Sequence, residues 1–358
     1  MAQPFCQSKA YRDLTQAAIY KLTEDQAREK FIYMRWGSLT NMPCPDCGTV
    51  DAHYPRRQRH QWRCKCCDRV FSVTSGTPFA NRKLPFKQLL LLIYEFVSSS
   101  QGCSANENHP KLEMTCRTAY QNFSKLREAI YEQADLTPLS GTVQIDGGHF
   151  CGKPRRPRKR AKATSSIVNN KLRNRKAGMV PNGTTHLEPW NQEKFKNRRI
   201  VLTMRQLSQV RGQGAERTIV RIVIAEKAQH VLPVIKKYVC PGATIQTDEG
   251  HAYSSLIAWY NHETVCHSVE YSTDTGVNNN QAESFFGRMR RAEYGTYNGM
   301  RPQYLAFYAS EFAWREDTRR LSLGKKFDDV LGKVLRCGLS KAWCGYFQGH
   351  RLGSEYLG

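Results

Sequence analysis

The fold of this chain is decided by three stretches of its sequence: GTVQIDGGHF (141–150), RIVLTMRQLSQV (199–210) and RTIVRIVIAE (217–226). Each is rich in apolar and β-branched residues, which is typical of buried β-strands. AQHVLPVIKKYV (228–239) has the apolar spacing of a helix, and ATIQTDEG (243–250) predicts a strand that ends on an acid.

This order of elements predicts an α/β domain. A further helix is expected within NNNQAESFFGRMRR (278–291), where Phe285, Phe286 and Met289 suit a helix that is buried on one side. Strand, strand, strand, helix, strand and helix is the order that an RNase H-like domain requires.

Three acidic residues fall on these elements: Asp146 and Asp248 at strand ends, and Glu283 on the last helix. Mg²⁺ prefers oxygen ligands, and two such ions held by carboxylates activate the attacking oxygen and stabilise the leaving oxygen in phosphoryl transfer. Arg290 follows Glu283 by seven positions, which places a cation on the same helix face. We therefore expect a catalytic site that depends on Mg²⁺ or Mn²⁺. A single Asp at a strand end is more often a turn residue, so the argument depends on all three acids.

The charge of the chain indicates a polyanionic partner. Lys and Arg outnumber Asp and Glu by 54 to 31 in 358 residues, a formal charge of +23. The segment 153–199 is dense in Arg and Lys and has almost no apolar periodicity, so we interpret it as a basic loop that binds DNA phosphates. A solvated linker is the alternative. The residues expected to contact DNA there are Arg155, Arg156, Arg158, Lys159 and Arg160.

Four of the 13 cysteines have the spacing of a structural zinc site. Cys44 and Cys47 form one C-x-x-C pair and Cys64 and Cys67 the other, so the two pairs can converge on one tetrahedral Zn²⁺. Cys66 is an alternative fourth ligand, although geometry favours Cys67. A basic zinc ribbon of this kind is usually a DNA-binding or docking module, but it can be purely structural. Its candidate DNA contacts are Arg56, Arg57, Arg59 and Arg63.

Helical patterns flank the ribbon. Residues 11–35 have helix-compatible spacing, and LPFKQLLLLIYEFVSSS (84–100) and TCRTAYQNFSKLREAIYEQA (115–134) predict two further helices. These two either form a helix-turn-helix unit that contacts DNA or simply pack together. The aromatic series of 304–314 predicts a helix behind the active site, with Glu311 and Arg315 at its polar edge.

The cysteine pairs, the segment FSVTSGTPFANRKLPF (71–86), the two aspartates and the block NNQAESFFGRMRRAEYGTYNGMRPQYLAFYASEFAWRED (279–317) resemble the ISXO-like insertion-sequence transposases, which are related to the Merlin transposons. The resemblance implies an N-terminal zinc ribbon, a helical DNA-binding segment and an RNase H-like domain with an Asp/Asp/Glu triad. It also implies that Asp146, Asp248 and Glu283 bind the catalytic metal, that Arg290 stands where the family commonly has Lys, and that the protein is a homo-oligomer. Gly147 follows Asp146 where the family usually has Glu, and the third position is Asn or His in some members.

These patterns predict five regions: an N-terminal helical segment (1–40), a zinc ribbon (41–80), a helical DNA-binding segment (81–138), an RNase H-like domain (139–322) and a C-terminal tail (323–358). The expected function is a transposase that binds terminal inverted repeats, cleaves the element ends and joins the 3′ hydroxyl to target DNA. The alternatives are an inactive DNA-binding regulator and a metal-dependent nuclease without strand transfer. No apolar run is long enough to cross a bilayer, so a cytoplasmic, nucleoid-associated protein of a bacterium is expected.

Overall fold

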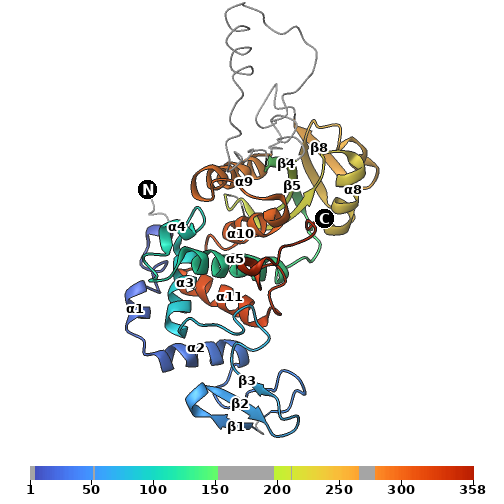
Figure 1. The fold of residues 1–358 in the computed structure, drawn as a ribbon. Helices are drawn as coiled ribbons and strands as arrows, with labels where there is room; N and C mark the ends of the chain where they lie inside the picture. Colours follow the sequence, from blue (N-terminus) through green and yellow to red (C-terminus); the bar gives the residue numbers. More distant parts are fainter. Residues whose placement is uncertain (1–4, 51–52, 152–196, 211, 266–278) are drawn as a thin grey trace, which may run out of the picture.

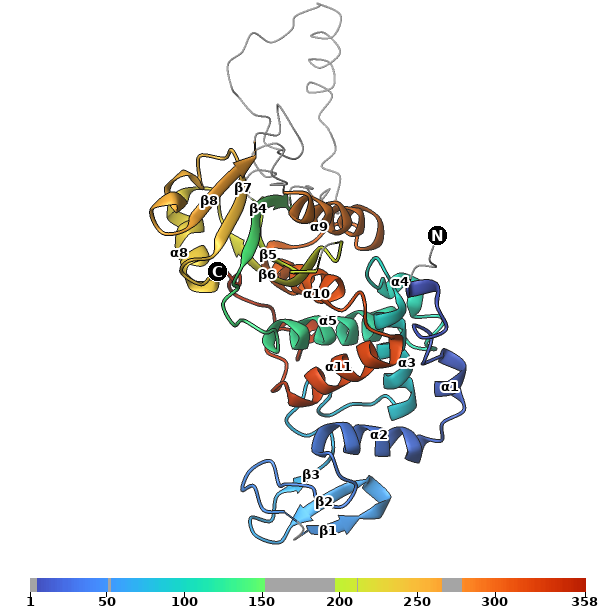
Figure 2. The same cartoon turned by 180° about the vertical axis from the view of Figure 1, so that it is seen from behind.

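The computed structural model describes residues 5–50, 53–151, 197–210, 212–265 and 279–358. The chain forms a small three-stranded sheet at one end, a helical body in the middle and a larger sheet with its own helices at the other end (Figure 1). The view from behind shows the same sequence of parts (Figure 2). None of the helices within these ranges is long and apolar enough to span a membrane.

The larger sheet has five strands in the order β6-β5-β4-β7-β8. Strands β4, β5 and β6 pair antiparallel, whereas β7 runs parallel to both β4 and β8. The predicted strands are all present, and β8 is an additional one. The strands are β4 (Thr142–Phe150), β5 (Arg199–Leu207), β6 (Ala215–Val223), β7 (Thr244–Asp248) and β8 (Asn261–Val265).

Both faces of this sheet are covered by helices, and alternate residues of each strand point to opposite faces. Val143 and Ile145 of β4 belong to a core formed with helix α8 (Ala228–Tyr238). Val201 of β5 belongs to a second core, with helices α9 (Asn280–Arg291) and α10 (Leu305–Asp317). Asp146 alternates with Ile145, so its side chain lies on the α9 face.

The helical body is one core made from both ends of the chain. Its helices are α1 (Gln16–Tyr20), α2 (Glu24–Trp36), α3 (Phe86–Ser98), α4 (Ala105–Asn108), α5 (Cys116–Glu132) and α11 (Leu323–Arg336). The segment 11–35, predicted as one helical element, is two helices. Helix α11 lies in the segment predicted as a tail, and it packs on α2, α3 and α5.

The helices α3 and α5 do not have the connection of a helix-turn-helix unit. Residues 99–115, including α4, separate them, whereas that motif uses a turn of about three or four residues. Leu89 to Ile93 of α3 are all buried, so this helix has no continuous exposed face. The two helices pack together in one core, which was the alternative to a helix-turn-helix unit.

The last residues of the chain are also packed rather than free. The carboxylate of Glu355 pairs with Arg199 of β5 at 2.5 Å, and Tyr356 packs against Tyr131 of α5. The N–H of Gly358 donates to the carbonyl of Ile222 on β6 at 2.9 Å. The region predicted as a tail therefore joins the sheet to the helical body.

The small sheet consists of β1 (His53–Arg56), β2 (Gln61–Cys64) and β3 (Val70–Phe71), all antiparallel. Trp62 and Phe71 pack against each other and against Trp36 at the end of α2, which attaches this sheet to the helical body. Short helical turns complete the chain: η1 (Phe5–Gln7), η2 (Arg57–Arg59), η3 (Ser254–Ala258), η4 (Ala292–Thr296), η5 (Pro302–Tyr304) and η6 (Tyr346–Gln348).

Candidate active site and zinc ribbon

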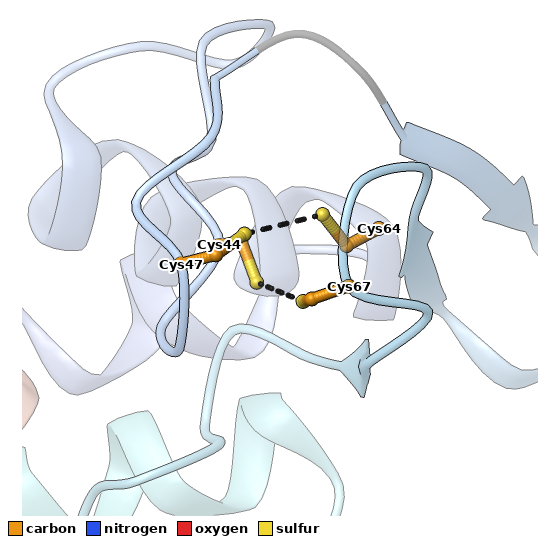
Figure 3. Close-up of side chains that lie close together, drawn as sticks. All are labelled: Cys44, Cys47, Cys64 and Cys67. Atoms are coloured by element: carbon orange, nitrogen blue, oxygen red, sulfur yellow. Dashed lines mark hydrogen bonds between the residues drawn. The ribbon is translucent and has the colours of Figure 1, made fainter.

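The four predicted zinc ligands converge. The Sγ atoms of Cys44, Cys47, Cys64 and Cys67 all lie within 4.8 Å of one another (Figure 3). The distance from Cys44 to Cys67 is 3.6 Å and that from Cys47 to Cys64 is 3.5 Å. Sulfur atoms bound at about 2.3 Å to one tetrahedral Zn²⁺ are about 3.8 Å apart, so this arrangement fits the ion.

The two cysteine pairs are held by the same backbone pattern. The carbonyl of Cys44 accepts from Gly48 N at 2.9 Å, and the carbonyl of Cys64 accepts from Asp68 N at 3.1 Å. Gly48 and Asp68 both have left-handed backbones, with φ of 71° and 58°. Gly48 therefore forms a tight turn in the first pair, and Asp68 forms the equivalent turn in the second pair.

Cys66 and His53 lie outside the ligand group. Cys66 is exposed and is not part of the converging set, which agrees with the choice of Cys67. His53 is half-buried between the carbonyl of Met42, at 2.6 Å from Nε2, and the ring of Phe71. The pKa of the Cys47 thiol is lowered to about 6, mainly by its hydrogen bond with the Thr49 hydroxyl.

The two candidate aspartates occupy equivalent positions on neighbouring strands. Pairing between β4 and β7 runs from Thr142–Thr244 to Gln144–Gln246. Asp146 and Asp248 each stand two residues beyond the last pair, so they lie at matching heights on the same face of the sheet.

Helix α9 begins beside the same point. The amide of Gln144 donates to the side chain of Gln246 at 3.2 Å, and its oxygen accepts the backbone N–H of Gln281 at 3.0 Å. This glutamine bridge links β4, β7 and the first turn of α9. Glu283 is exposed two residues further along α9, so the bridge places the helix that carries the third acid on the side of the sheet that carries the aspartates.

Electrostatics also links these acids. Burial and the charge of Asp248 raise the pKa of Asp146 to about 7, with further contributions from Glu226 and Glu283, although the N–H of Gly147 lowers it. The acids do not form a group of three carboxylates that all lie within 4.8 Å of one another. Within the described ranges, the cysteine group is the one set of three or more potential ligands whose atoms all lie within 4.8 Å.

Glu226 was not predicted as a site residue. It follows β6 and precedes α8, and its carboxylate occupies the space where a Cβ on Gly147 would lie. Tyr253 is only 1% exposed, and its hydroxyl donates to Glu226 Oε1 at 2.8 Å. The sequence carried a signal, because Glu226 ends a predicted strand just as Asp146 and Asp248 do.

The candidate basic residues are only partly described. Arg290 is exposed on α9 and lies over the rings of Phe150 and Phe286, 5.8 Å from each centroid. Arg56, Arg59 and Arg63 are exposed on the ribbon. The side chain of Arg57 and the five residues proposed from the basic loop, Arg155, Arg156, Arg158, Lys159 and Arg160, lie outside the described residues.

Two known families match parts of this chain. The ISXO2-like transposase domain matches residues 138–317, half of the chain, and the transposase zinc-ribbon domain matches residues 22–70. The chain belongs to the ISXO2-like transposase family. Cys44, Cys47, Cys64 and Cys67 form the metal-binding cluster of its zinc ribbon.

A curated relative is an uncharacterized protein in transposable element ISH50 of Halobacterium salinarum. It is 24% identical over 127 residues, which is 35% of this chain and 41% of that protein. The chain therefore matches less than half the length of this relative. No solved structure matches the chain.

Proposed function

We propose that this chain is an insertion-sequence transposase that binds the terminal inverted repeats of its element, cleaves the ends and joins the freed 3′ hydroxyl to target DNA. Asp146, Asp248 and Glu283 are the proposed catalytic acids. The observation that carries the proposal is the register of β4 and β7, which sets both aspartates at one height beside the start of α9.

The larger sheet supports an RNase H-like assignment for the catalytic domain. Its strand order, β6-β5-β4-β7-β8, places the first strand of the domain at the centre, and β5 is antiparallel to both of its neighbours. The two aspartates lie on the central strand and on the parallel strand beside it. Their side chains share one face of the sheet at one height.

The donor set fits Mg²⁺ or Mn²⁺. Asp146, Asp248 and Glu283 offer only carboxylate oxygens, the ligands that hard cations prefer. Their mutual repulsion contributes to the raised pKa of Asp146, and a bound cation would relieve it. Divalent ions held there would polarise the scissile phosphate and lower the pKa of the attacking water or hydroxyl.

The residues around the acids have separate roles in this proposal. The N–H of Gly147 donates to Asp146 Oδ1 at 2.7 Å and the N–H of Gly250 donates to Asp248 Oδ1 at 3.1 Å, so both carboxylates are held in orientation. Arg290 and Arg291, exposed in the last turn of α9, would contact DNA phosphates next to the acids. The exposed arginines of the ribbon would bind the element end. A homo-oligomer that pairs two ends is proposed on the family resemblance.

The test is strand transfer of a labelled element-end duplex into a plasmid in the presence of Mg²⁺. The native chain is compared with Asp248→Asn, Glu283→Gln and the control Glu249→Gln, which neutralises an exposed acid next to Asp248. Joined product is expected from the native chain and the control, and not from the other two variants.

Other outcomes identify other functions. Cut ends without joined product from the native chain would indicate a nuclease. Tight binding of the ends with neither product would indicate a DNA-binding regulator.

A further inference from the structure

We infer that Glu226 is a fourth carboxylate of the proposed metal site, held in place by Tyr253. The inference rests on the proposed function, since it concerns the same site. It adds a ligand from the opposite face of the sheet to the three acids that the sequence indicates.

The position of Glu226 is the first argument. Gly147 and Asp146 are consecutive on β4, so they face opposite sides of the sheet: Asp146 faces α9 and Gly147 faces α8. The Glu226 carboxylate lies against Gly147, where any larger side chain would overlap it. It therefore approaches β4 at Gly147 from the α8 side, while Glu283 lies on the helix that covers the other side.

The end of the pairing between β4 and β7 allows Glu226 to approach the two aspartates. No pair follows Gln144–Gln246 between β4 and β7, both of which are fully described. Beyond this pair β4 stays paired with β5 and β7 with β8, but no ladder joins β4 to β7, so a side chain from the α8 side can reach the space between the two aspartates. The charge of Glu226 acts on Asp146, and that of Asp248 acts on Glu226, so the four acids form one electrostatic group.

The hydrogen bonding of Glu226 is the second argument. Tyr253 is buried and donates to Oε1 at 2.8 Å, which fixes the carboxylate. In the described part of the chain, Oε2 has no hydrogen-bond partner and no Lys or Arg pairs with this glutamate. A half-buried carboxylate beside other carboxylates is costly without a counter-charge, and a divalent cation would supply one.

Tyr253 is linked to the second aspartate as well. It follows Gly250, whose N–H donates to Asp248 Oδ1, and a side chain added at Gly250 would meet both Asp248 and the ring of Tyr253. The turn after β7 thus positions Asp248 through its backbone and Glu226 through its tyrosine. One short segment orients two of the four carboxylates, which makes Tyr253 a positioning residue.

The experiment measures Mn²⁺ binding to the full, zinc-loaded chain by electron paramagnetic resonance, without DNA. Glu226→Gln keeps the size of the side chain and its ability to accept from Tyr253, but removes its charge. We expect it to weaken Mn²⁺ binding about tenfold or more. Tyr253→Phe is expected to weaken binding less, because the carboxylate remains but is no longer fixed. Asp248→Asn and Glu249→Gln are the positive and negative controls.

The outcomes separate the two proposals. Native affinity in Glu226→Gln, together with lost affinity in Asp248→Asn, would overturn the role of Glu226 and leave the proposed function standing. Absence of Mn²⁺ binding to the native chain would overturn both. Thermal unfolding without Mn²⁺ gives a second readout: relief of repulsion is expected to raise the melting temperature of Glu226→Gln, whereas loss of a merely structural contact would lower it.

Discussion

The guanidinium of Arg127 on α5 lies 2.6 Å from the carboxylate of Glu311 on α10, and the two side chains are 3% and 0% exposed. Arg315 binds the same carboxylate at 2.7 Å, and the hydroxyl of Tyr297 donates to it at 2.9 Å. This buried group joins the helical body to the domain that carries the candidate catalytic acids.

Glu311→Gln is expected to destabilise the protein by about 3–5 kcal/mol, because it leaves two buried guanidinium groups without their counter-charge. Urea unfolding followed by circular dichroism measures the change. Glu107→Gln, which removes an exposed ion pair with Lys111, is the control and is expected to have little effect. Equal stability of the two variants would contradict the structural role of Glu311.

Asp146 is expected to make the stability of the chain depend on pH when Mg²⁺ is absent. Its folded-state pKa is raised from 3.8 to about 7, first by burial and then by the charge of Asp248. The protonated form therefore favours the folded state below the ordinary pKa, and this contribution is lost as the pH rises towards 7. Asp146→Asn removes this titrating group. The melting temperature of the variant minus that of the native chain is therefore expected to increase from pH 4 to pH 7. A constant difference across this range would contradict the assignment.

Asp248→Asn is expected to reduce cleavage of an element-end duplex by about a hundredfold or more, because a bound metal contributes several kcal/mol of transition-state stabilisation. Binding of the duplex, measured by fluorescence anisotropy, is expected to stay close to native. Glu249→Gln changes the adjacent exposed acid and is expected to cleave normally. Equal loss in both variants would indicate a general effect of charge instead of a ligand role for Asp248.

Cys44→Ser is expected to release zinc and to unfold the ribbon, because a structural Zn²⁺ contributes directly to folding. Cys66→Ser is the matched control, since Cys66 is outside the converging group, and it is expected to retain one zinc per chain. Elemental analysis of the purified proteins measures the zinc content. Loss of zinc in Cys66→Ser would show that the ligand set is different.

Replacement of Arg56, Arg59 and Arg63 by Ala is expected to weaken the binding of duplex DNA. It is also expected to make the binding constant less dependent on salt concentration. Each phosphate contact that is lost should reduce the slope of log K against log salt by about 0.9. The zinc content of the variant shows whether the ribbon is intact. An unchanged slope with full zinc content would mean that this face of the ribbon does not contact DNA.

The sequence predicted most of the larger sheet because its strands are strongly apolar and are separated by clear turns. Strand β8 was missed: Asn261–Val265 is an edge strand in which only Val265 is buried, so it lacks a periodic signal. The sequence predicts Glu311 at the polar edge of its helix, and this prediction is wrong because the residue is 0% exposed. Its partner Arg127 lies 184 residues away, and no local pattern encodes that contact.

The sequence predicts both aspartates at strand ends. This is right for Asp248, which ends β7, and wrong for Asp146, because β4 continues to Phe150 in its pairing with β5. The β4–β7 register still sets the two residues at one height. Glu226 ends a predicted strand too, but β6 is separated from β4 by β5, so its approach to Gly147 depends on the path of the chain between β6 and α8.

The inclusion of α11 in the helical body affects the biosynthesis of the protein. Phe327 and Leu331 share one core with Phe31 and Leu92, so the N-terminal helices lack part of their packing until residues 323–336 have left the ribosome. The region that precedes the sheet is therefore completed only after the sheet itself has been translated. A nascent or prematurely terminated chain would carry its zinc ribbon on an unfinished support, and a fragment that ends at the family domain would need residues 323–336 supplied in trans to restore it.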